Sequence, residues 1–396
     1  MMPRGVILAL ATLSHGLGAF TALAVAPLSP FLLEALGLSR GHVGFFIPAV
    51  YLGGVAMSLP AGWLVDRLGV RATLTLGQLL LGATVAIAAW APTLPALLAC
   101  LVAGGLGFSV LNPATGKAVI DWFPPPRRGM AMGIKQTGLT LGGLAAALVL
   151  PPVALALSWR HALAAAGAAS LVSATLVGLL YRRPPTHEAT PGLARPRLAE
   201  LGAFLRRPAI LVVFGCGFLL SIAQSSVLAY LALYAKETLA VSAVTAGRLL
   251  ALAQAGGATA RLVWGVVSDR SFGGRRRPGV VASAVIGAIA YALFAVGDTL
   301  PLAAMGLLAF VAGAGAFGWV GLYFALVGEI GGARHAGLLT GAATAAAWSG
   351  TLVGPPLFGL VLEATGVYAP SWLVLTAVAL VVALTLPRLR PLVERG

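Results

Sequence analysis

Four cationic side chains and one histidine fall inside long apolar segments of this 396-residue chain, namely His15, Lys117, Lys135, Arg248 and Arg261. Every carboxylate maps instead to the end of an apolar segment, to a loop or to the C-terminal tail. Because an unpaired charge inside a membrane is costly, an ionisable residue there generally serves a function. Several internal cations without an internal anion indicate a binding site that receives its counter-ion from an anionic substrate.

Arg261 is the first candidate for direct contact with such an anion. Its planar guanidinium can donate two parallel hydrogen bonds to a carboxylate or a similar oxyanion. In a helix, Gln254, Gly257 and Ala258 share its face, so that small residues leave room for a ligand and Gln254 adds hydrogen bonds. The alternative is that the Arg261 side chain extends to the cytoplasmic surface of the membrane.

Lys117 and Lys135 lie at similar depths, each about six residues from a cytoplasmic loop. We expect both to be substrate contacts or gating charges, with Gln136 beside Lys135 as a further hydrogen-bonding group. Extension of either lysine to the interface is the alternative. For Lys117, so is a structural pair with Asp121 four residues later.

Other polar residues complete the candidate site. His15 lies near the middle of the first apolar segment, where it could bind substrate or titrate near neutral pH, or simply pack. Tyr230 and Tyr323 could line the site, although aromatic residues on a helix face usually serve packing. Arg248 lies close to the outer end of its segment and is expected at the interface.

The composition requires that these residues be positioned by membrane helices. Of the chain, 59% is hydrophobic and only 9% is charged, whereas a soluble domain is usually about 25% charged. The mean hydropathy is +0.96. A β-barrel would show alternating segments of ~10 residues instead. The two cysteines, Cys100 and Cys216, both lie in apolar segments, so neither a disulfide framework nor a metal or cofactor site is expected.

Twelve apolar segments, most of them longer than the roughly 20 residues that a membrane-spanning helix needs, are long enough to cross a membrane. They span residues 6–36, 42–65, 72–91, 95–122, 129–155, 160–181, 209–236, 242–268, 278–297, 301–328, 336–362 and 369–386. Nineteen basic residues fall in the loops or tails on one side and three on the other, which predicts that the first side, with both termini, is cytoplasmic. The net charge of +15 is thereby explained without nucleic acid.

The chain repeats itself. The segment "GWLVDRLGVR" begins at Gly62 and "GVVSDRSFGGRRR" begins at Gly265, an offset of 203 residues. Asp121 matches Glu329 at an offset of 208. Repeated halves joined by a cytoplasmic linker are typical of transporters. We therefore predict an all-α membrane protein of twelve transmembrane helices in two pseudo-symmetric six-helix bundles, residues 1–181 and 209–396, with a cytoplasmic linker at 182–208.

The repeated motif resembles the Gly-x-x-x-Asp-Arg-x-Gly-Arg loop of the major facilitator superfamily, and the resemblance extends over nearly the whole chain. Gly62, Asp66, Arg67 and Gly69 match, whereas the final arginine is displaced by one residue to Arg71. The resemblance implies two bundles around a central cavity that opens alternately to each side.

It also implies a gating network at the cytoplasmic ends of the helices, which would stabilise the outward-open state. Its expected members are Asp66, Arg67, Arg71, Asp121, Asp269 and Arg270, with Asp66 paired to Arg71.

The function that these features favour is secondary transport of a small organic anion, a mono- or dicarboxylate, across the cytoplasmic (inner) membrane by proton symport or anion exchange. Arg261 resembles the span-8 arginine of oxalate/formate exchangers and monocarboxylate transporters, but span 11 here has no lysine. A monomer is expected, with the substrate, protons and the lipid bilayer as its partners.

Other functions stay open. An inorganic oxyanion such as nitrate is one alternative, although a Gly-Asn-rich signature is missing. Efflux of amphipathic drugs is another, although such exporters typically place an acid within the membrane. An enzyme is not expected, since the apolar segments hold one histidine and no carboxylate for acid–base chemistry. A sensor or scaffold without transport activity also fits.

Overall fold

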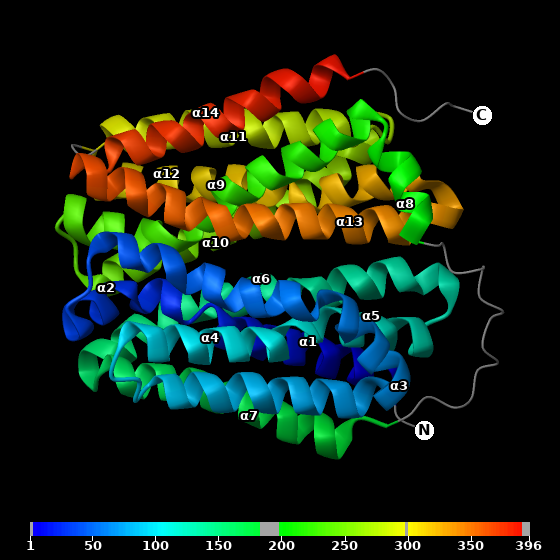
Figure 1. Ribbon diagram of the computed structural model, residues 1–396, viewed down its shortest axis with the longest axis horizontal. Coiled ribbons are helices and arrows are strands. Elements are labelled where there is room, and N and C mark those ends of the chain that lie inside the picture. Colours follow the sequence, from blue (N-terminus) through cyan, green and yellow to red (C-terminus); the bar gives the residue numbers. More distant parts are fainter. Residues whose placement is uncertain (1–2, 183–197, 298–299, 390–396) are drawn as a thin grey trace. The chain divides into compact units, whose positions relative to one another are not determined.

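The computed structural model describes residues 3–182, 198–297 and 300–389, which are helical almost throughout and contain no strand (Figure 1). The all-α prediction is therefore confirmed. The chain separates into two compact units: unit 1 comprises Met1–Glu188 and Ala232–Ala251, and unit 2 comprises Ala189–Leu231 and Leu252–Gly396. Residues 183–197 of the predicted cytoplasmic linker lie outside the described part of the chain.

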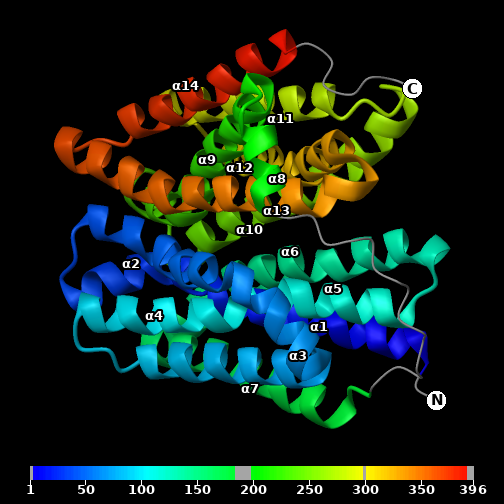
Figure 2. The ribbon, with the colours of Figure 1, turned by 45° about the vertical axis from the view of Figure 1, so that its right-hand side comes forward.

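Unit 1 contains the first helices of the chain and the junction of α9 and α10. Its elements are α1 (Arg4–Ala22), α2 (Val25–Leu36), η1 (Arg40–Phe45), α3 (Phe46–Ala88), α4 (Leu94–Ser109), α5 (Leu111–Trp122), α6 (Pro125–Ala156) and α7 (Trp159–Leu180). The long helix α3 packs along α4 and α7, and the three lie side by side in both views (Figures 1 and 2).

Unit 2 contains most of α9 (Pro208–Thr238) and α10 (Ala243–Arg270) and all the later helices. These are α11 (Arg277–Val296), α12 (Leu302–Gly318), α13 (Val320–Thr365), α14 (Ala369–Thr385) and η2 (Leu386–Arg388). A short helix, α8 (Leu198–Leu205), lies within the segment that the sequence predicted as a linker. Its Leu201 and Phe204 pack on the core of unit 2, a tertiary contact that local pattern does not reveal.

Eleven helical segments among the described residues are long and apolar enough to cross a membrane. The sequence predicted twelve. The difference arises at α3, which joins the predicted spans 42–65 and 72–91 in one element that bends at Gly69, and only Pro60–Ala88 of it is among the eleven. Gly69 has φ 81° and ψ 165°, a backbone conformation that a residue with a β-carbon rarely adopts.

Three spans that the sequence predicted as continuous are interrupted. The first divides into α1 and α2, and the fourth divides into α4 and α5 at Val110. Proline explains these two breaks, because Pro27 lacks the N–H that would bond the carbonyl of Leu23 and Pro113 lacks the one that would bond Ser109. A third break, at Trp319 between α12 and α13, has no proline next to it.

Glycine brings α1 and α6 into close contact. A β-carbon built at Gly138 would collide with the carbonyl oxygen of Thr12, and one at Gly142 would collide with that of Gly16. Small residues allow two helix backbones to approach in this way within a membrane. The contact places His15 of α1 against the part of α6 that carries Lys135.

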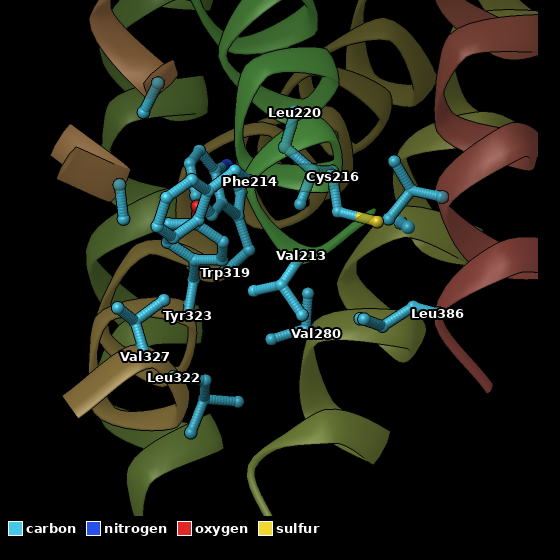
Figure 3. Close-up of a cluster of buried hydrophobic side chains, with 14 of the residues drawn as sticks. Val213, Phe214, Cys216, Leu220, Val280, Trp319, Leu322, Tyr323, Val327 and Leu386 are labelled. Atoms are coloured by element: carbon cyan, nitrogen blue, oxygen red, sulfur yellow. The ribbon is translucent and has the colours of Figure 1, made fainter. Parts of the chain in front are cut away.

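The core of unit 2 gathers aromatic and aliphatic side chains from several helices. Figure 3 shows Phe214 and Cys216 of α9, Tyr323 of α13 and Trp319, which lies at the break before α13. The rings of Trp319 and Tyr323 meet edge to face with centroids 5.3 Å apart, an arrangement that aromatic pairs favour. The residue at the break between α12 and α13 is thus buried in this core.

Candidate functional site

Lys135 is buried in unit 1 with 3% of its surface exposed. Its ammonium donates to Oδ1 of Asn112 at 2.5 Å, to Oε1 of Gln136 at 3.0 Å and to the backbone oxygen of Asn112 at 3.5 Å. All of these oxygen atoms are neutral. In the part of the chain that the structure describes, Lys135 is therefore solvated by dipoles while its positive charge stays uncompensated.

The break between α4 and α5 presents Asn112 to this lysine. Asn112 lies in the first turn of α5, directly before Pro113, and its side chain is exposed. The backbone carbonyl oxygen of Asn112 also accepts a hydrogen bond from the hydroxyl of Thr115 at 3.3 Å, which helps to fix the backbone. Sequence reasoning missed Asn112, although an asparagine before a proline inside an apolar segment was a usable signal.

His15 lies beside Lys135, with which it interacts electrostatically, and its side chain is buried. Its Nδ1 atom has no hydrogen-bond partner among the described atoms. We define the Lys135 cluster as His15, Asn112, Lys135 and Gln136. It unites three residues that the sequence predicted with one that it did not.

A second polar group adjoins the cluster on α1. The fully buried Gln78 of α3 donates from Nε2 to the backbone oxygen of Ser14 at 2.6 Å and to its hydroxyl at 3.0 Å. Its Oε1 atom is buried and finds no partner among the described atoms. An unsatisfied buried acceptor costs about 1–3 kcal/mol, so Oε1 of Gln78 is an unfilled hydrogen-bond acceptor next to the Lys135 cluster. Sequence reasoning also missed Gln78.

Arg261 lies in unit 2 and is half-buried. Its Nε donates to the carbonyl oxygen of Phe317 at 2.9 Å. Phe317 is in the last turn of α12, where the backbone carbonyls lack partners within the helix. The contact fixes the plane of the guanidinium. Gln254, two turns earlier on α10, is buried on the same helical face.

The two cations share a structural device. Lys135 donates a hydrogen bond to the backbone oxygen of Asn112, just after the break at Val110. Arg261 donates one to the backbone oxygen of Phe317, just before the break at Trp319. These breaks fall at corresponding places in the two halves, one residue from the offset that aligns Asp121 with Glu329. Each interruption therefore supplies a neutral backbone oxygen to a cation from a neighbouring helix.

Of the two roles that the sequence predicted for Lys117, a substrate contact or a gating charge, its position favours the second. Its ammonium lies 3.0 Å from Oδ1 of Asp66, and the two side chains are 37% and 52% exposed. The expected pair of Asp66 with Arg71 was wrong, because the guanidinium of Arg71 donates instead to the carbonyl of Gly178 on α7. Lys117 therefore belongs with the motif residues.

The other motif residues of unit 1 surround this pair. Asp121 interacts electrostatically with Lys117, Asp66 and Arg128. The guanidinium of Arg128 donates to the carbonyls of Phe123 and Ile120, both at 3.0 Å, at the end of α5. Arg67 lies over the ring of Trp63, 5.0 Å from its centroid.

In unit 2 the corresponding carboxylates are joined by Arg276. Its guanidinium donates to Asp269, to Oε1 of Glu329 at 3.0 Å and to the hydroxyl of Ser268 at 3.0 Å. The hydrogen bond that Arg276 donates to Asp269 raises the pKa of Arg276 above its usual value, so the guanidinium keeps its charge at any physiological pH. The sequence pointed to Arg270, which is exposed on the surface, and missed Arg276 within the run of three arginines.

Three further residues of the sequence prediction lie away from these clusters. Tyr230 is fully buried and stacks on Phe358 with centroids 4.5 Å apart. Tyr323 lies in the core shown in Figure 3. Arg248 is exposed on α10. Since both tyrosine rings are enclosed by hydrophobic side chains, we leave them out of the candidate site.

The comparisons with known proteins place the chain among transporters. A family model described as Major Facilitator Superfamily matches residues 8–355. An uncharacterized MFS-type transporter of Mycobacterium tuberculosis is 29% identical over 356 residues, which are 88% of this chain and 77% of that protein. A hexuronate transporter of Bacillus subtilis is 23% identical over 387 residues, covering 93% and 90% of the two chains.

A third relative and a solved structure point the same way. A galacturonate transporter of Dickeya chrysanthemi is 30% identical over 181 residues, covering 46% of this chain and 52% of that protein. A crystal structure of a bacterial homologue of the human lysosomal transporter Spinster superposes with a TM-score of 0.82, covering 96% of this chain and 95% of that one at 17% identity. At this identity the likeness establishes the fold alone.

Proposed function

Because this chain belongs to the Major Facilitator Superfamily, we propose that it is a secondary transporter of small organic anions that works by alternating access. The observation that carries the proposal is the Lys135 ammonium, which is buried and contacts neutral oxygen atoms among the described residues. A buried cation without a counter-ion is unfavourable. A substrate carboxylate would supply the missing charge.

Sugar acids are the first substrates to test. The names of two relatives, a hexuronate transporter and a galacturonate transporter, denote molecules with one carboxylate and several hydroxyl groups. The Lys135 cluster offers an ammonium for the carboxylate and the amides of Asn112 and Gln136 for hydroxyl groups. Arg261 and Gln254 of unit 2 are the second set of substrate contacts in the proposal.

The proposal includes the membrane arrangement. The chain is a multi-pass membrane protein with many spanning helices. We propose that it lies in the cytoplasmic membrane as twelve helices in two six-helix bundles, with both termini inside. Coupling is by proton symport or by exchange of anions, and in the symport case His15 or the substrate would carry the proton.

Uptake into proteoliposomes tests the function directly. Radiolabelled glucuronate and galacturonate should accumulate, and glucose and galactose, which share the ring but lack the carboxylate, should not. Nitrate and an amphipathic cation serve as competitors that represent the alternative functions. Preferential binding or uptake of the cation, or of the neutral sugars, would overturn the proposal of an organic anion.

Gating at the cytoplasmic motif is tested by Asp66→Asn, which removes the carboxylate that holds Lys117. An exposed ion pair contributes roughly 0.2–1 kcal/mol, so the balance between conformations should shift by up to about fivefold. Substrate affinity should be retained while turnover in proteoliposomes falls. Lys117→Gln should have the same effect, and the double variant should add nothing further. Unchanged turnover in both single variants would mean that the pair only anchors the loop.

A further inference from the structure

We propose that Asn112 determines the charge selectivity of the site: its neutral amide holds the Lys135 ammonium in the empty transporter and yields it to the carboxylate of the incoming anion. This inference rests on the proposed function. Asn112 is not part of the duplicated Asp-Arg motif. It lies between Val110, where the helix breaks, and Pro113. The proposal follows from the short contact between Oδ1 of Asn112 and Nζ of Lys135.

The orientation of the amide is fixed by chemistry. A lysine ammonium only donates hydrogen bonds, so the oxygen of the Asn112 amide, and not its NH₂ group, must face it. At 2.5 Å this is the shortest of the contacts that Lys135 makes. The amide thus substitutes for water around the buried ammonium without neutralising it.

The contact is also placed where a ligand can replace it. Lys135 itself is 3% exposed, whereas the side chains of Asn112 and Gln136 are both exposed. A ligand that reaches the ammonium therefore meets these two amides first. A carboxylate oxygen that takes the place of Oδ1 makes a hydrogen bond of the same kind with an added charge attraction, which is stronger than the neutral contact.

A neutral side chain at position 112 leaves the Lys135 ammonium without a counter-ion, so that the site binds an anion. Aspartate has nearly the shape of asparagine, but its carboxylate would form a permanent ion pair with Lys135. The pair would carry no net charge, and the incoming anion would meet a like charge next to the ammonium. Selectivity for anions therefore depends on the amide of Asn112, which differs from the carboxylate of aspartate only by an NH₂ group in place of one oxygen.

The experiment compares Asn112→Asp with Asn112→Leu, which has a similar size and no charge. The probe is glucuronate, with binding to the full-length purified protein measured by calorimetry. Asn112→Asp should lower affinity on the order of 30-fold or more, as expected when a buried charge pair is lost. Asn112→Leu should lower affinity by only about fivefold, because the cation remains and only neutral hydrogen bonds of the amide are removed.

A thermal unfolding measurement without ligand separates this effect from misfolding. Asn112→Asp should unfold at a higher temperature than Asn112→Leu, because the new carboxylate compensates the buried ammonium. Loss of binding together with a raised unfolding temperature supports the proposal. Equal loss in both variants would assign Asn112 a role through shape or hydrogen bonding, and parental affinity in Asn112→Asp would exclude any role in charge selection.

The parent protein distinguishes this inference from the function on which it rests. If the parent binds glucuronate or galacturonate and Asn112→Asp binds them equally well, the function stands and the inference is wrong. If the parent binds neither sugar acid and no other small organic anion, both are overturned together.

Discussion

Replacing Lys135 with methionine should abolish most anion binding and at the same time make the protein more resistant to heat. Removal of one partner of a buried charge pair costs about 2–5 kcal/mol, which corresponds to on the order of 30-fold or more in affinity. In the unliganded protein, however, the same change removes a buried ammonium whose partners among the described residues are neutral. Replacing buried charges with hydrophobic groups of similar volume is often stabilising.

The opposite signs of the two effects make this test informative. Binding is measured by calorimetry with glucuronate, and stability by thermal unfolding of the unliganded protein in detergent. Lys135→Arg is the matched control, since it keeps the positive charge and should retain part of the binding. Parental affinity in Lys135→Met would contradict the assignment. So would a variant whose binding and stability fall together, because that outcome indicates a structural lysine.

Replacing Arg261 with alanine should reduce binding by a similar or larger factor. The Nε contact with Phe317 orients the guanidinium, and a planar guanidinium matches the geometry of a carboxylate. A lost charged hydrogen bond in a buried site costs roughly 2–5 kcal/mol. Arg261→Lys should restore little, because an ammonium on a flexible chain can neither bond Phe317 in the same way nor present two parallel donors.

Arg248→Ala provides the control for this prediction. Arg248 is on the same helix, α10, but it is exposed and lies near the start of the helix. Removal of this charge should leave affinity for glucuronate and uptake in proteoliposomes nearly unchanged. Parental binding in Arg261→Ala, or equal losses in the Arg248 and Arg261 variants, would show that Arg261 is not a specific partner of the anion.

The sequence by itself determined the class of protein and the repeat. Hydropathy and the distribution of arginine predicted membrane helices, because both depend on the transfer of single residues between water and lipid and not on their neighbours. The duplicated Asp-Arg motif predicted the family, which the match over residues 8–355 confirms. Sequence also predicted the depth of His15, Lys135 and Arg261 in the membrane, since position along a spanning helix sets depth.

Only the tertiary structure decided which helices meet and therefore which groups bond. Lys117 and Lys135 are indistinguishable by depth, yet one pairs with Asp66 and the other with Asn112. A partner on another helix depends on how the helices rotate and approach, as at the Gly138 contact between α1 and α6. No pattern within a single segment contains that information. For the same reason Arg276 and Gln78 emerged only in the folded chain, where a buried charge or amide takes the nearest group that can satisfy it.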